Sequence, residues 1–158
     1  MSATASPTAT FVISAIDPDI AEQLRRRGGP LFVANSYPGF PCRQCLRDAD
    51  VGDELILVSY DPFRTDSPYR CSSPIFLHAH DCAAQRDTSD LPEQIRRRTL
   101  SVRAFDANAM MLSAKVVEGS ALPDLIETLF TDEHVDHIHV HNAGPGCWAT
   151  RIDRPGSA

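Results

Sequence analysis

Two cysteines separated by two residues are the first feature of the sequence with evident chemistry. In Cys42-Arg43-Gln44-Cys45 the two sulfurs can grip one metal ion, and zinc sites of this kind use further cysteines or histidines to complete a tetrahedron. The chain has no second C-x-x-C motif, so the other ligands must come from Cys82, Cys147 or histidines elsewhere. The motif therefore suggests a zinc site but does not identify the ligands that would complete it.

The same motif has a redox interpretation. A reactive dithiol needs a C-x-x-C at the start of a real helix, where the helix dipole lowers the pKa of the first thiol. Asp48, Asp50 and Gly52 follow closely in the sequence and stop any helix within about two turns. We therefore keep a thiol-dependent enzyme or redox protein, with Cys42 as its nucleophile, as the alternative to metal binding.

Three histidines alternate with apolar residues in His137-Ile138-His139-Val140-His141. In a strand they lie on one face, and neighbours on that face are roughly 6–7 Å apart at their bases, close enough for two rings to share an ion. We expect His141 to lie opposite Cys147 across the following turn, which would add a thiolate and leave a fourth position open. The alternative is an ordinary polar or hydrogen-bonded strand face.

A second group, His78-Ala79-His80-Asp81-Cys82, has the same alternation if its strand continues that far. The predicted metal ligands are therefore Cys42, Cys45 and His139, joined by Cys147 or His78, and the predicted ion is Zn²⁺. A plain ligand-binding or protein-binding domain with ordinary thiols is the third possibility.

Short elements must position these residues. Residues 11–16, 31–35, 54–60 and 75–79 read as strands. Asp17-Pro18 and Gly28-Gly29 bound a helix over 18–27, because the first pair suits a helix start and the second a left-handed stop. Asp90 and Glu93 resemble a capping box at the start of another short helix.

The C-terminal part has the clearest pattern. Leu100, Val102 and Ala104 alternate with polar residues, and the alternation resumes at Met110, which predicts a hairpin with Asp106 opposite Met110 and Ala104 opposite Leu112. Apolar spacing between residues 120 and 132 predicts a helix, and 135–141 and 147–152 predict two more strands. This strand-strand-helix-strand-strand unit indicates an α+β fold with a mainly antiparallel sheet and short covering helices.

Composition limits the classes of protein and partner. The chain has 158 residues, a net charge of −6 and a pI near 5.4, which argues against nucleic acid or an anionic membrane as the main partner. We expect a disordered tail at 1–9, one α+β domain at 10–154 and a tail at 155–158. No signal peptide or membrane span is evident, so five cysteines in a cytoplasmic, reducing compartment are expected to be thiols or metal ligands.

Four stretches resemble the domain-of-unknown-function family 1203. They are PGFPCRQCLRDADVGDELILVSYDPF at 38–63, DSPYRCSSPIFLHA at 66–79, LSVRAFDANAMMLSAKVVEG at 100–119 and VDHIHVHNAGPGCWATRID at 135–153. The resemblance implies a small, uncharacterised bacterial cytosolic protein and no established activity, substrate or cofactor. The chain departs from the family pattern at Ala109, where a glycine is usual, and at His141, where an arginine is usual. The first departure requires Asn108 or Ala109 to adopt the left-handed turn position.

Overall fold

The computed structural model describes residues 10–83 and 88–156. The expected tail at 1–9, and residues 157–158 of the expected tail at 155–158, lie outside these residues. The strands are β1 (Val12–Ser14), β2 (Leu31–Val33), β3 (Glu54–Tyr60), β4 (Ser73–His78), β5 (Thr99–Phe105), β6 (Met111–Glu118), β7 (His137–Asn142) and β8 (Trp148–Asp153). The helices are α1 (Pro18–Arg27), α2 (Glu93–Arg96), the 3₁₀ turn η1 (Gly119–Ala121) and α3 (Leu122–Leu129).

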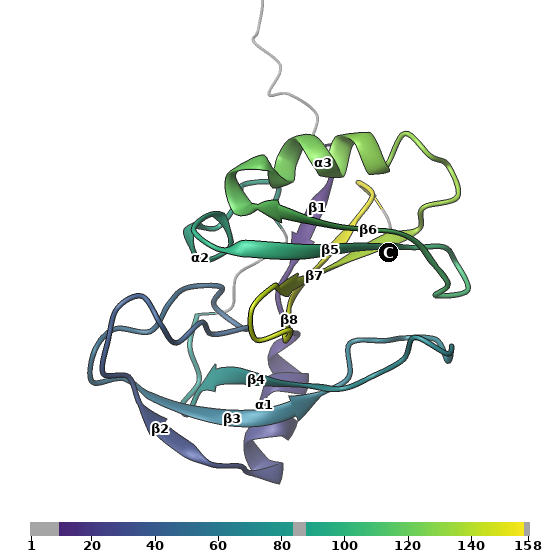
Figure 1. Ribbon diagram of the computed structural model, residues 1–158. Helices are drawn as coiled ribbons and strands as arrows, with labels where there is room; N and C mark the ends of the chain where they lie inside the picture. The colour runs from purple at the N-terminus through teal and green to yellow at the C-terminus, as the bar shows by residue number, and fades with distance from the viewer. Residues whose placement is uncertain (1–9, 84–87, 157–158) are drawn as a thin grey trace, which may run out of the picture.

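The strands form two antiparallel sheets (Figure 1). The first has the order β1-β8-β7-β5-β6 and the second the order β2-β3-β4. The predicted α+β class, the short helices and the C-terminal strand-strand-helix-strand-strand unit are all confirmed. Among the described residues, no helix is long and apolar enough to cross a membrane.

Each sheet has its own apolar core. Leu122 and Ile126 of α3 pack on one face of the five-stranded sheet, against residues such as Val102 and Ile138. Figure 1 shows α3 lying across that face. The second core joins α1, β3 and β4 to the C-x-x-C loop, and it also takes in Trp148 of β8. The C-x-x-C loop is therefore a buried part of the fold.

Helix α1 begins and ends where the sequence predicts. The Asp17 carboxylate accepts a hydrogen bond of 2.8 Å from the backbone N–H of Asp19, and Gly28 has a φ of 81° after the last turn. The predicted capping box of α2 is wrong. Its N-cap residue is Pro92, which lacks a side-chain donor or acceptor, and Glu93 is already inside the helix.

The predicted register of the β5–β6 hairpin holds only at the turn. Asp106 N–H donates to the carbonyl of Met110, and Ala109 takes the left-handed position with a φ of 58°. A bulge between Ala104 and Phe105 then shifts the pairing by one residue, so Ala104 lies opposite Ser113 and not Leu112. Because one residue reverses strand parity, Leu112 and Val116 are exposed on the far face.

A second bulge, between Val140 and His141, changes the β7–β8 register. His141 lies opposite Trp148, and His139 lies opposite Arg151. The predicted pair of His141 with Cys147 is therefore wrong. Ile138, Val140 and Ile152 share one apolar face, whereas Trp148 packs into the other core.

Gly119 permits a close contact that a side chain would block. A Cβ atom there would collide with the carbonyl oxygens of Ile95 and Arg96 in α2. We expect Gly119→Ala to lower the free energy of unfolding by about 2 kcal/mol, since the backbone must move to admit one methyl group. Gly144→Ala is the matched control, because a methyl group at that position would meet no other atom within 4 Å. Urea unfolding of both variants checks the difference, and equal stabilities would contradict this account.

Candidate metal centre

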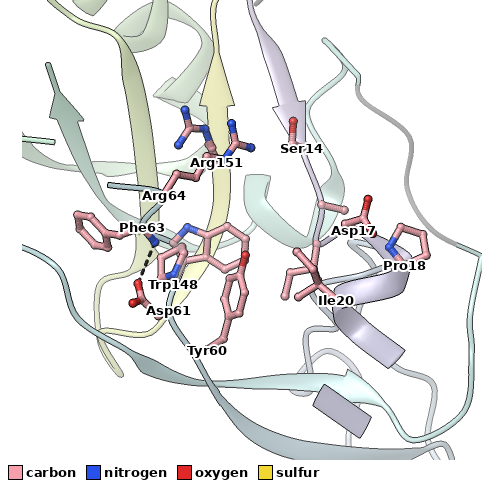
Figure 2. A pocket seen from close by; sticks show the side chains of 13 residues that line it. Ser14, Asp17, Pro18, Ile20, Tyr60, Asp61, Phe63, Arg64, Trp148 and Arg151 are labelled. Carbon is pink, nitrogen blue, oxygen red and sulfur yellow. Dashed lines mark hydrogen bonds between the residues drawn. The ribbon is translucent and has the colours of Figure 1, made fainter. Parts of the chain in front are cut away.

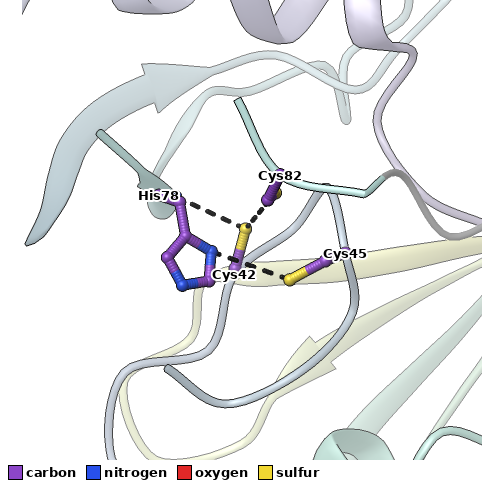
Figure 3. A group of neighbouring side chains, drawn as sticks. All are labelled: Cys42, Cys45, His78 and Cys82. Atoms are coloured by element: carbon purple, nitrogen blue, oxygen red, sulfur yellow. Dashed lines mark hydrogen bonds between the residues drawn. The ribbon is translucent and has the colours of Figure 1, made fainter. Parts of the chain in front are cut away.

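Four side chains with metal-binding atoms converge beside the end of β4. Figure 3 shows them: Cys42, Cys45, His78 and Cys82. One ligand atom from each lies within 4.8 Å of the others. The Sγ atoms of Cys42 and Cys82 are 3.8 Å apart, and the Sγ of Cys45 is 3.7 Å from Nδ1 of His78. The first two cysteines are buried, whereas His78 and Cys82 are partly exposed.

The C-x-x-C loop is a tight turn fixed against β4. Cys42 pairs with Phe76 of β4 in a parallel bridge, and its N–H donates to the carbonyl of Arg47 at 3.0 Å. Leu46 reverses the chain with a φ of 55°, an uncommon conformation for a branched side chain. Because Leu46 is also buried, packing holds the chain in this conformation and keeps both thiols at the end of β4.

The two partly exposed residues of the cluster are anchored by neighbouring polar side chains. Gln44, inside the motif, donates from Nε2 to Oδ1 of Asp81 at 3.0 Å and to the carbonyl of Cys82 at 3.2 Å. Arg25 of α1 donates from Nε to the carbonyl of His78 at 2.8 Å. The chain therefore bends after β4 in a way that brings Cys82 back toward Cys42.

Asp53 fixes the orientation of the His78 ring. Its Oδ2 lies 3.1 Å from Nε2 of His78, while Nδ1 of the same ring faces Cys45. A carboxylate beside Nε2 holds a proton there, so Nδ1 is the nitrogen that can bind a cation once its own proton is displaced. Histidine ligands in metal sites are commonly oriented by such a carboxylate.

The side chains of the cluster shift one another's pKa values. Hydrogen bonds from Cys45 and Cys82 hold the pKa of the Cys42 thiol well below its usual range, against the effect of burial. Hydrogen bonds to Cys42 and Cys45 raise the pKa of His78 to about 11. The bond to Cys42 is the main cause that raises the pKa of Cys82. A thiolate with adjacent donors is an arrangement that a divalent cation can stabilise by replacing protons.

The structure brings together only some of the predicted ligands. Cys42, Cys45 and His78 meet in the cluster, but His139 and Cys147 are not members of it. His139 is fully buried among aromatic rings, with Phe63 at 4.9 Å and Phe105 at 5.1 Å between centroids. The Sγ of Cys147 accepts a hydrogen bond of 3.0 Å from the guanidinium of Arg43.

Cys82 is absent from the predicted ligand set, although it is one of the residues that could close a zinc site. The feature of the sequence that points to Cys82 as a cluster residue is its position four residues after His78. Strand parity continued through this segment would place His80 with Cys82 and His78. Instead β4 ends at His78, so the bend brings Cys82 inward and leaves the His80 side chain 84% exposed.

Comparison with known proteins gives one match. The model of a family described as "Protein of unknown function (DUF1203)" matches residues 39–154. The chain belongs to this DUF1203 family. The matched region contains all four residues of the cluster. No curated protein and no solved structure matches this DUF1203 protein.

The histidine face of β7 makes the stability of the protein depend on pH. Burial lowers the pKa of His139 to about 2 and that of His141 to about 4. Both nitrogens of His139 are buried and lack a hydrogen-bond partner among the described residues. Below the ordinary histidine pKa near 6.5, these histidines take up protons in the unfolded chain but stay neutral in the folded protein. The free energy of unfolding therefore falls as the pH falls.

We expect His139→Leu to weaken this dependence. Between pH 6 and pH 4, the fall in the free energy of unfolding should be smaller than in the wild type by about 1.4 kcal/mol per pH unit. At pH 7 the variant should be at least as stable, because two unsatisfied polar atoms leave the core. Urea unfolding at several pH values checks this, with the exposed His134→Gln as control. An unchanged slope in His139→Leu would contradict the buried neutral histidine.

Proposed function

We propose that this protein binds one zinc ion through Cys42, Cys45, His78 and Cys82. The ligand atoms would be the three Sγ atoms and Nδ1 of His78. Three sulfurs and one imidazole nitrogen form a common donor set for structural zinc, and thiolates favour this ion over magnesium or calcium.

The spacing of the ligand atoms is the observation that carries the proposal. A tetrahedral ion with Zn–S bonds near 2.3 Å holds its sulfurs about 3.8 Å apart, and a sulfur and a nitrogen about 3.6 Å apart. The corresponding distances here are 3.8 Å between Cys42 and Cys82 and 3.7 Å between Cys45 and His78. The side chains therefore need little rearrangement to bind the ion.

The number of ligands favours a structural role over catalysis. Catalytic zinc sites usually have three protein ligands and an open position for water, whereas this cluster supplies four. Two of the four side chains are buried, and the loop that carries them belongs to an apolar core. We infer that the ion stabilises the C-x-x-C loop and the three-stranded sheet.

Thiol redox chemistry is the second candidate, because the lowered pKa of Cys42 and its neighbour Cys82 at 3.8 Å suit a dithiol. Two observations favour metal instead. Cys42 is fully buried, so a redox partner cannot reach it, and the motif forms a turn with no helix to lower the thiol pKa. In either case we place the protein in a reducing bacterial cytoplasm, where all five cysteines stay free thiols or ligands.

Metal content tests the proposal. Protein purified without a histidine tag or chelator should contain about one equivalent of zinc by inductively coupled plasma mass spectrometry. Cys82→Ser should lose most of it, because one of four ligands is gone. Cys71→Ser is the matched control, since that thiol is exposed and outside the cluster. Less than about a tenth of an equivalent of any transition metal in the wild type would overturn the proposal whatever the variants do.

The role of Asp53 gives a second test. Asp53→Asn keeps the shape of the side chain but removes the charge beside Nε2 of His78, so the ring becomes a weaker ligand. We expect the zinc affinity to fall about tenfold or more, measured by competition with a chromophoric chelator. Asp50→Asn makes the same change of charge nearby on a side chain outside the cluster, and its affinity should be unchanged. Equal affinities of the two variants would exclude the proposed orientation of His78.

A further inference from the structure

A cleft lies on the opposite side of β8 from the α3 core, and none of its lining residues belongs to the cysteine cluster. Its volume is about 970 Å³, which is large enough for a small organic molecule. Figure 2 shows its walls, which come from the segment leading from β1 into α1, the loop after β3, and β8.

Aromatic rings form one wall of the cleft. The rings of Tyr60 and Trp148 lie 5.1 Å apart between centroids, whereas the ring of Phe63, in the loop after β3, turns away to pack on His139 and Phe105. Flat apolar groups pack well on such a surface. The wall therefore suits a ligand with a planar ring.

The charged groups of the cleft indicate the sign of that ligand. Both carboxylates already have partners, since Asp17 accepts from the N–H of Asp19, and Asp61 accepts from Arg70 at 2.7 Å. Arg151 is bound through Nε and Nη2 to Asp153. Within the described part of the chain, the Arg64 guanidinium has no hydrogen-bond or ion-pair partner. The cation that remains unmatched is Arg64.

The indole of Trp148 closes the inner end of the aromatic wall. Its side chain is 2% exposed, and its Nε1–H is buried without a hydrogen-bond partner among the described residues. Because this nitrogen has no surface open to the cleft, a ligand in the cleft does not reach it. The Arg64 guanidinium is therefore the unmatched donor that a ligand can meet, and such a ligand must bring acceptors.

We propose that this cleft binds a small organic anion that carries a carboxylate on a flat apolar ring. The ring packs on the aromatic wall beside Tyr60, and the carboxylate accepts hydrogen bonds from Arg64. Arg151 lies at the same end, since Arg64 and Arg151 both line this cleft and a neighbouring cavity of about 200 Å³, but its charge is already paired with Asp153. Figure 2 draws their guanidinium groups at that end of the cleft.

The matched probes for this site are 2-naphthoate and 2-naphthamide, which share a ring system and differ in charge. Trp148 is the only tryptophan of the chain, so a ¹H–¹⁵N correlation spectrum contains a single indole cross-peak as a local reporter. Naphthoate should shift this peak with saturation below about 1 mM, and naphthamide should bind about tenfold more weakly or not at all. A cross-peak that does not move at about 2 mM naphthoate would overturn the proposal.

Two arginine variants locate the contact. Arg64→Ala should weaken naphthoate binding about tenfold, because it removes the charge that the carboxylate meets. Arg26→Ala removes an arginine of α1 that is 78% exposed and outside the cleft, and it should leave the affinity unchanged. Equal affinities of wild type and Arg64→Ala would overturn the proposed site. The two sites share no residue, so a failure of this test leaves the proposed metal site standing.

Discussion

The guanidinium of Arg43 joins the C-x-x-C loop to the C-terminal sheet from inside the protein. It is 1% exposed and donates to the carbonyls of Trp148 and Pro41 as well as to Cys147. No carboxylate forms an ion pair with it among the described residues, so the hydrogen bonds are what stabilise the buried charge. A buried cation with fixed acceptors tolerates little displacement. The position of this one side chain therefore sets where the loop lies between the two sheets.

The C-x-x-C loop contributes two residues to the cysteine cluster and also contacts β8, which borders the cleft. Cys42 and Cys45 flank Arg43 and face the end of β4, where the other two cluster residues meet them. The carbonyl of Trp148 receives the arginine, and the indole of Trp148 lines the cleft. Asp48 adds a further restraint through its ion pair with an arginine just before β5, whose closest contact is 2.6 Å. Rigid supports of this kind keep ligand atoms at fixed separations without help from the ligand.

Local patterns in the sequence predict the elements and three of the four cluster residues, but not the features that depend on distant contacts. An Asp-Pro start and a glycine stop define α1, and the C-x-x-C motif and His78 belong to the cluster. No local sequence pattern indicates the bulge at Ala104, because it results from packing strands into a twisted sheet. Simple alternation along the strand therefore assigns Leu112 to the wrong face. The H-x-H pattern likewise favours His139 over Cys82, whose inward turn depends on a contact with Gln44 that spacing does not reveal.

The positions of the four cluster residues along the chain have a consequence for folding order. Cys42 and Cys45 are near neighbours and could hold an ion in the unfolded chain, whereas His78 and Cys82 come from the far side of the β3–β4 hairpin. An ion held by all four would cross-link the chain around that hairpin and reduce the entropy of the unfolded state, as a disulfide does. Unlike a disulfide, such a link would form and dissociate with the supply of metal.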